Sequence, residues 1–453
     1  MSVTIEKILA ASPNTERGRP TQLSTDPKGE RIAYASGKSV FLRSLDDPSL
    51  SKQYTTHTAQ TTVARFSPSG FYIASGDVSG AVKVWDAVEG VNTKDSKRFV
   101  TASADQTVKL WDVEAGKAVQ TWRFGGDGNV GVVWPAGRSD GMVVSLNLAG
   151  DLNYLAEGTP TPTKVVQGHN KSVTAFGSSQ DGKSQTFWTG SFEGRVCSWD
   201  SETGVGSAVD GQTHSNQVSS FTTTNGRAYS VGWDDTLRIA DTSNNTFLGD
   251  ASKLSGQPKG VSSADGRIFI ATTSGIEIFS NDKAVGSLLT KDFTPTAIAA
   301  SGTTVAVGDD QNVIHIYSVD SSNKLTEKEK LTVSTSQITT LSFTSSGSFL
   351  AAGNSAGKIY VFDSGSWKVK TDRWSAHTAR VTCIAWNDEE THAVSGGLDT
   401  NVFVWSLKAP GKRVKAANAH KDGVNGVVWV GSGKVASSGG DAALKIWKVA
   451  GLE

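Results

Sequence analysis

The chain has 453 residues, in which 44 Lys and Arg balance 44 Asp and Glu, so its formal net charge is zero. This balance excludes an overall field that would draw the whole protein to nucleic acid or to an anionic membrane. The two cysteines, Cys197 and Cys383, cannot form a disulfide framework and fit a reducing compartment. The N-terminus has no secretory signal pattern, and no apolar run approaches the ~20 residues of a membrane span. We therefore expect a cytoplasmic protein without membrane insertion.

One phrase recurs along the chain: a short apolar strand, a turn rich in Gly and Asp, and a second strand that ends in Trp or another aromatic residue. This final slot falls at positions 43, 85, 111, 154, 199, 240, 279, 317, 362, 405 and 447, and weaker copies place Arg43 and Ala240 in it. All intervals but one lie between 38 and 45 residues, close to the ~40–45 residues of a four-stranded propeller blade. The period therefore predicts an all-β protein built from WD-type propeller blades.

A histidine recurs upstream of the slot, since five of the seven histidines lie 26 to 30 residues before it. An aspartate lies six residues before the slot in four copies. In WD repeats the His, a strand Ser or Thr, the turn Asp and the Trp indole N–H form a hydrogen-bonded chain. We expect an incomplete hydrogen-bonded chain in repeats where Gly replaces the Ser, at Gly397 and Gly439. The same holds where Ser79 or Glu193 replaces the turn Asp. The predicted network residues are His57, Trp85, Ser103, Asp105, Trp111, His169, Trp199, His214, Asp234, His377, Asp399, Trp405, His420, Asp441 and Trp447.

The number of slots requires two propellers, because eleven exceed the typical 4–8 blades of one ring. Seven regular repeats predict a seven-bladed C-terminal propeller over residues 164–453, and four remain for an incomplete N-terminal propeller over residues 1–163. The short interval between the slots at 85 and 111 leaves no room for a blade. We infer an internal deletion near Lys94-Asp95, with a genuine four-bladed ring as the alternative.

The two ends of the chain are expected to meet. The last repeat ends soon after its third strand, and residues 3–9 alternate apolar and polar residues as an outer strand does. Propellers often close by pairing one terminus with the other, which removes an exposed edge. Residues 3–9 are therefore the candidate outer strand of the last C-terminal blade.

Three longer phrases resemble the actin-interacting protein 1 family: TVARFSPSGFYIASGDVSGAVKVWD (62–86), GWDDTLR (232–238) and SGGLDTNVFVWSLKAPGKRVKAANAHKDGVNGVVW (395–429). The resemblance covers essentially the whole chain. It implies two seven-bladed propellers in a cytoplasmic protein that binds cofilin-decorated actin filaments and promotes their severing and disassembly. It implies no catalytic centre and no cofactor. We expect a monomer that is associated with the actin cytoskeleton at cortical patches and binds no nucleic acid.

Other interpretations of these residues are weaker. The histidines lie on separate blades and cannot converge on one ion as zinc requires, and the turn aspartates are separated in the same way. We therefore predict no metal site and no catalytic residues. Trp233, which lies in a turn beside two aspartates, is the candidate for an exposed partner contact. The alternative function is a general WD-repeat adaptor, for signalling or as a ubiquitin-ligase substrate receptor.

Overall fold

The computed structural model describes residues 2–16, 21–67, 70–87, 98–112, 115–123, 128–135, 138–181 and 184–452. These residues form 43 strands, and no helix occurs among them. The predicted all-β fold class is confirmed. The deletion inferred near Lys94-Asp95 lies outside the described residues.

In the C-terminal part, strands that follow one another in the chain pair side by side in the same order. Each sheet is therefore a β-meander. The first three sheets are β16 (Val173–Asp181), β17 (Ser184–Ser191), β18 (Val196–Asp200) and β19 (Gly206–Ala208); β20 (Val218–Thr224), β21 (Arg227–Gly232), β22 (Thr236–Asp241), β23 (Thr246–Phe247) and β24 (Ser252–Lys253); and β25 (Pro258–Ala264), β26 (Arg267–Thr272), β27 (Gly275–Ser280) and β28 (Lys283–Leu289). The next three are β29 (Pro295–Ser301), β30 (Thr304–Asp309), β31 (Ile314–Val319) and β32 (Leu325–Leu331); β33 (Ile338–Phe343), β34 (Phe349–Asn354), β35 (Lys358–Asp363) and β36 (Val369–Ser375); and β37 (Val381–Trp386), β38 (His392–Gly397), β39 (Val402–Ser406) and β40 (Arg413–Ala416). The last contains β41 (Val424–Val430), β42 (Lys434–Gly439) and β43 (Leu444–Ala450).

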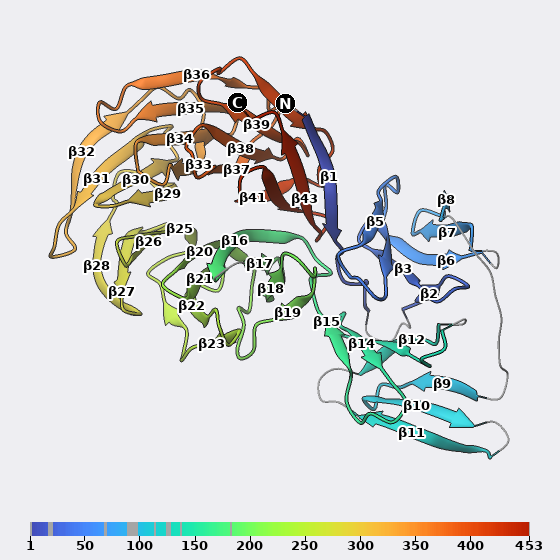
Figure 1. Ribbon diagram of the computed structural model, residues 1–453. Helices are drawn as coiled ribbons and strands as arrows, with labels where there is room; N and C mark the ends of the chain where they lie inside the picture. Colours follow the sequence, from blue (N-terminus) through green and yellow to red (C-terminus); the bar gives the residue numbers. More distant parts are fainter. Residues whose placement is uncertain are drawn as a thin grey trace.

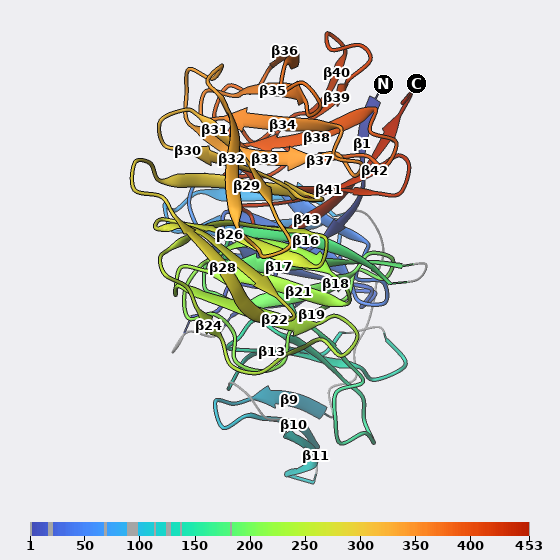
Figure 2. The ribbon, with the colours of Figure 1, turned by 90° about the vertical axis from the view of Figure 1, so that its left-hand side faces the viewer.

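The first strands of these sheets surround a common centre. Each packs against the first strand of the next sheet, and β41 packs against β16. A cavity of about 600 Å³ is lined by residues from all of these first strands. Figures 1 and 2 show the sheets following one another in chain order, from green through yellow to red. The sheets are therefore arranged as propeller blades are.

Hydrogen bonds between side chains and backbone join neighbouring sheets near this centre. The hydroxyl of Thr174 donates to the carbonyl of Val218 in the next sheet, at 2.6 Å. Thr339 donates to Val381 in the same way, also at 2.6 Å. The amide of Asn425, on β41, donates to the carbonyl of Val173 at 2.7 Å and so links the last sheet to the first.

The last sheet takes its outer strand from the other end of the chain. β1 (Ser2–Leu9) pairs antiparallel with β43, with Val3 opposite Val449 and Leu9 opposite Leu444. The side chains of Ile8 and Leu9 are buried, whereas Ile5 is 50% exposed. This pairing covers the edge that β43 would otherwise expose.

The N-terminal part contains four smaller sheets in the described residues. They are β2 (Ser24–Thr25), β3 (Arg31–Ser36), β4 (Ser39–Ser44) and β5 (Ser51–Tyr54); β6 (Thr61–Phe66), β7 (Tyr72–Asp77) and β8 (Val82–Asp86); β9 (Arg98–Ala102), β10 (Thr107–Asp112) and β11 (Lys117–Arg123); and β12 (Asn129–Val133), β13 (Val143–Asn147), β14 (Leu152–Leu155) and β15 (Lys164–Val166). Because β15 pairs with β14, it completes a sheet of the N-terminal part. β15 thus lies in the range that the repeat count assigns to the C-terminal propeller, residues 164–453, and these domain bounds stay a prediction.

The N-terminal sheets form an open series. Sheet β2–β5 shares one core with sheet β12–β15, through Tyr34, Phe41, Leu146 and other residues. Sheet β6–β8 packs on the other side of β2–β5, and β9–β11 packs on β12–β15. Sheets β6–β8 and β9–β11 therefore lie at the two ends of the series (Figure 1). The outer face of β6–β8 exposes Val82 and Val84, by 72% and 66%.

The two parts are joined by polar contacts. The backbone N–H of Ser12 donates to the carbonyl of His169, at 2.8 Å. Arg195 forms an ion pair with Asp151 at 2.5 Å, and both side chains are largely buried. Lys421 donates to the carbonyl of His57. These contacts link loops of the first and last C-terminal sheets to the N-terminal part.

Candidate functional site

The last sheet contains a complete hydrogen-bonded chain of the predicted kind. The indole N–H of Trp447 donates to Ser437 Oγ at 2.7 Å, and Ser437 Oγ lies 2.7 Å from His420 Nε2. His420 Nδ1 lies 2.7 Å from a carboxylate oxygen of Asp441. A neutral His420 with its hydrogen on Nδ1 satisfies all of these contacts, since Ser437 can then donate to Nε2. The chain links β42, β43 and the turn between them to the loop that precedes β41.

The chain recurs in the sheet before it, with one correction to the sequence interpretation. Trp405 donates to Ser395 Oγ at 2.8 Å, His377 Nε2 lies 2.8 Å from the same oxygen, and His377 Nδ1 lies 2.9 Å from Asp399. The expected replacement of the strand Ser by Gly397 and Gly439 is wrong. The hydroxyl comes from two residues earlier, Ser395 and Ser437, whereas a Cβ at Gly397 or Gly439 would lie within 2.7 Å of the His side chain.

The second N-terminal sheet also has a complete chain. His57 contacts Asp77 and Ser75, each at 2.8 Å, and Trp85 donates to Ser75 at 2.8 Å. Asp77 takes the place of the expected turn Asp, and it also accepts the hydroxyl hydrogen of Ser79. The hydrogen bond from Ser79, and then that with His57, lowers the pKa of Asp77 to about 2.

In sheet β9–β11 the predicted residues do not form one chain. Trp111 donates to Thr101 Oγ1 at 2.9 Å, so the strand hydroxyl is Thr101 and not the predicted Ser103. The Ser103 hydroxyl accepts from the backbone N–H of Asp105 at 3.2 Å, and Asp105 accepts from the hydroxyl of Thr107 at 2.6 Å. Ser103 and Asp105 therefore stabilise the turn between β9 and β10.

Two further sheets contain partial chains. His169 and Trp199 both contact Thr189 Oγ1, at 2.7 Å, but His169 Nδ1 has no partner. His214 contacts Asp234 and Ser230, each at 2.9 Å, where the slot residue is Ala240 and supplies no indole. All the predicted network histidines are therefore buried and hydrogen-bonded within their own sheets.

The electrostatics of these residues favour a structural role. Burial lowers the pKa of His169 to about 3, and burial also lowers the pKa values of His377 and His420, so these imidazoles are neutral at pH 7. Burial raises the pKa of the Cys197 thiol to about 11 and that of Cys383 to about 12, so neither is a thiolate. Such buried groups are not placed to act on a substrate.

The described residues include no group of three or more His, Cys, Asp or Glu side chains that could hold a metal ion. Within the same ranges there is also no helix long and apolar enough to cross a membrane.

The exposed candidate residue, Trp233, belongs to a repeated surface position. It follows β21, is 42% exposed, and donates its backbone N–H to the carbonyl of Gln217 at 2.8 Å. The equivalent N–H donates in the same way in every C-terminal sheet. We name the surface formed by these positions the turn surface; its residues are Phe192, Trp233, Thr273, Asp310, Ser355, Leu398 and Gly440.

Three residues of the turn surface are large, apolar and exposed: Phe192 by 56%, Trp233 by 42% and Leu398 by 48%. Phe192 and Trp233 lie on consecutive sheets. Leu398 is separated from Phe192 by one sheet, which contributes Gly440, so the three occupy one arc. Exposed apolar side chains that gather in this way mark protein contacts more than isolated ones do.

The sequence analysis missed Phe192 and Leu398, although a signal for them exists. Each lies seven residues before its slot residue, as Trp233 does. The residue type varies at this position from repeat to repeat, whereas an acidic residue follows it in all three of these repeats. Only the structure shows that the residue at this position points to solvent.

The turn surface reaches the junction with the N-terminal part. A small cavity of about 230 Å³ lies between residues 36–39, which form the equivalent turn of sheet β2–β5, and residues 440–442 of the last sheet. Lys38 and Asp422 form an exposed ion pair at 3.1 Å beside it. The turn positions of the two parts are therefore neighbours here.

Comparisons with known proteins agree with the repeat architecture. Residues 48–86, 88–112 and 411–448 match the WD domain, G-beta repeat, and residues 290–421 match the Vps8 beta-propeller. The chain is 29% identical to actin-interacting protein 1 of Caenorhabditis elegans over 610 residues and 25% identical to that of Drosophila melanogaster over 602, with 98% of each chain covered. It is 26% identical to WD repeat-containing protein 1 of Gallus gallus over 612 residues, covering 99% of both chains. These alignments are longer than the 453 residues of this chain, so each relative has a long stretch without a counterpart here.

Proposed function

We propose a function on the premise that this chain is a WD-repeat protein homologous to actin-interacting protein 1 and WD repeat-containing protein 1. It is a binding scaffold, without catalytic activity, that attaches to actin filaments and cooperates with cofilin to promote their severing and disassembly. It acts as a monomer in the cytoplasm, at cortical actin patches. The observation that carries this proposal is the similarity along nearly the whole chain to proteins named for their interaction with actin.

The turn surface supplies the contact in this proposal. Phe192 and Trp233 offer large apolar side chains that lose their contact with water on binding, and aromatic residues dominate the binding energy of many interfaces. The sheets beneath them are held in place by their hydrogen-bonded chains and by contacts with neighbouring sheets. A rigid support lowers the entropy cost of binding.

The test is a severing assay on single fluorescent actin filaments. Filaments are imaged with cofilin alone, with this protein alone, and with both. We expect the number of breaks per filament length to rise when both are present, above the sum of the separate effects. An unchanged break frequency at saturating protein would refute the cooperation with cofilin. If, in addition, the protein did not bind filaments but retained ligase or signalling subunits in a pull-down, the adaptor function would replace it.

A further inference from the structure

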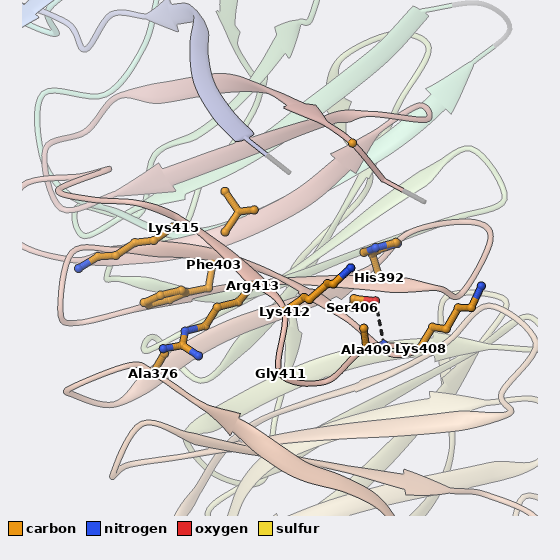
Figure 3. A pocket seen from close by; sticks show the side chains of 12 residues that line it. Ala376, His392, Phe403, Ser406, Lys408, Ala409, Gly411, Lys412, Arg413 and Lys415 are labelled. Carbon is orange, nitrogen blue, oxygen red and sulfur yellow. Dashed lines mark hydrogen bonds between the residues drawn. The ribbon is translucent and has the colours of Figure 1, made fainter.

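A basic depression lies at the outer end of the sixth C-terminal sheet. It has a volume of about 1100 Å³ and is formed around the hairpin of β39 and β40, next to Ala376 and Gly451 (Figure 3). Four cationic side chains line it: Lys408, Lys412, Arg413 and Lys415. No Asp or Glu is among its lining residues. We name it the basic groove.

These cations can meet an external charge, and the Lys415 ammonium also lies over the Phe403 ring, 5.8 Å from its centroid. All four residues are exposed, and none forms an ion pair in the part of the chain that the structure describes. The contrast is Lys358 in the preceding sheet, which is paired with Asp372 at 3.1 Å. Four unpaired positive charges on one concave surface repel each other, and a negatively charged ligand removes that cost.

Backbone hydrogen bonds and strand alternation position the residues that carry these charges. The loop between β39 and β40 is held by hydrogen bonds from Ala409 N–H to Ser406 Oγ at 3.1 Å and from Lys412 N–H to the Ala409 carbonyl at 2.8 Å. In β40, alternation exposes Arg413 and Lys415, while Val414 between them is half-buried. The backbone that carries these charged side chains is therefore held by its own hydrogen bonds.

The directions of the side chains favour an extended ligand. Lys415 and Lys408 reach toward opposite sides of the groove, and the guanidinium of Arg413 points away from the ammonium of Lys412 (Figure 3). A single phosphate group requires donors that converge on it, as these do not. In addition, among the described strands β40 pairs with β39 alone and is the edge of its sheet, so an extended chain can pair with its backbone.

Two other kinds of polyanion fit less well. Single-stranded nucleic acid is held by exposed aromatic rings, but Phe403, the aromatic lining residue, is only 3% exposed. A membrane surface needs a convex basic face or an apolar anchor, and the groove is concave. We propose that the basic groove binds an acidic segment of another polypeptide, in an extended conformation along β40. This binding is separate from the proposed contact of the turn surface with actin.

The test measures binding of a fluorescent decaglutamate peptide to the full chain by anisotropy. The variant Lys408→Glu, Lys412→Glu, Lys415→Glu is compared with a matched control, Lys283→Glu, Lys324→Glu, Lys328→Glu, whose lysines are also exposed and unpaired in the described residues. We expect the groove variant to lose at least about tenfold in affinity and the control less than about threefold. Raising the salt from about 50 to about 300 mM should weaken binding to the unsubstituted chain.

Three results would overturn the proposal. The first is that the unsubstituted chain binds the peptide no more tightly than the groove variant does. The second is an equal loss in the control variant, which would mean that only net charge matters. The third is that the groove binds phosphatidylserine vesicles, inorganic phosphate or an oligonucleotide more tightly than it binds the peptide. Circular dichroism of each variant establishes that it is folded, and the conservative variant Lys412→Arg should keep its affinity.

Discussion

At the scale of single residues, the structure assigns the buried histidines to the support of the sheets. The sequence predicted five of them at one repeat position, and the structure places each beside a strand hydroxyl. The sequence did not identify the correct hydroxyl in every sheet, because Ser437 and Gly439 are both candidates until the strand register is known. Spacing alone gives the repeat, whereas register decides which side chains face each other.

We expect the central hydroxyl of a complete hydrogen-bonded chain to contribute more to the free energy of unfolding than an equally buried hydroxyl beside it. Ser437→Ala leaves the indole N–H of Trp447 and Nε2 of His420 without their partner, and we expect a loss of about 2–4 kcal/mol in the free energy of unfolding. Ser438→Ala is the matched control, because Ser438 is also fully buried but its hydroxyl has no partner. Urea titration should show little change for the control. Equal losses in the two variants would contradict the role given to the chain.

The neutral histidines also predict a pH dependence. The pKa of His169 is about 3 in the folded chain, below its ordinary value of 6.5, so the unfolded chain binds more protons as the pH falls below 6.5. Stability is therefore complete above pH 6.5 and declines on acidification toward pH 3. Between pH 7 and 5, His169→Gln should make the decline shallower by up to about 1.4 kcal/mol per pH unit. Urea titrations at several pH values measure this slope, and identical slopes would contradict a buried neutral His169.

At the scale of strands and sheets, the period predicted the sheets well, and the alternation of residues 3–9 pointed to the strand that pairs with β43. The sequence could not show how deeply each side chain of that strand is buried. Ile8 and Leu9 are adjacent and face opposite sides of the strand, yet both are buried, because Ile8 packs in the core shared with the N-terminal sheets and Leu9 packs in the core that contains Phe187 and Trp199. A single sequence does not show that both faces of this strand are covered.

Truncation within β1 should have strongly position-dependent effects. Leu9 is fully buried against Phe187, Trp199 and Leu444, so Leu9→Ala should lower the free energy of unfolding by about 2–5 kcal/mol. Ile5→Ala, on the half-exposed side of the same strand, should cost less than about 1 kcal/mol. Deletion of residues 1–10 should lower the melting temperature clearly. An unchanged melting temperature would contradict the contribution of β1 to the last sheet.

Sheet β6–β8 offers a comparison between a covered and an uncovered sheet. Val82 and Val84 are exposed in β8, whereas Val402 and Val404, at the same repeat positions in β39, are each about 1% exposed. Val82→Thr with Val84→Thr should leave the melting temperature unchanged and reduce self-association, measured by light scattering. Val402→Thr with Val404→Thr should lower the melting temperature, because two hydroxyls enter a core. Similar effects of the two pairs would show that β8 is covered in solution.

At the scale of the whole molecule, the sequence does not predict the contacts between the N-terminal and the C-terminal sheets. Arg195 and Asp151 stand on different parts and fall at no repeated position, so nothing in the period links them. The period also does not show which residues of the turn surface lie on one arc, because it does not give the order of the sheets in space. Trp233 is conspicuous in the sequence, but Phe192 and Leu398 fall on the same arc as Trp233 only when the sheets are arranged around their centre.

The most direct test of the account is co-sedimentation with cofilin-decorated actin filaments. The unsubstituted chain is compared with Phe192→Ser, Trp233→Ser and with a control, Val285→Ser, Val369→Ser, which changes exposed apolar residues near the opposite ends of their sheets. We expect the chain and the control to pellet with filaments and the turn-surface variant to lose at least about tenfold in affinity. Equal pelleting of all three would contradict binding through the turn surface, and no pelleting of the unsubstituted chain would contradict the proposed association with actin itself.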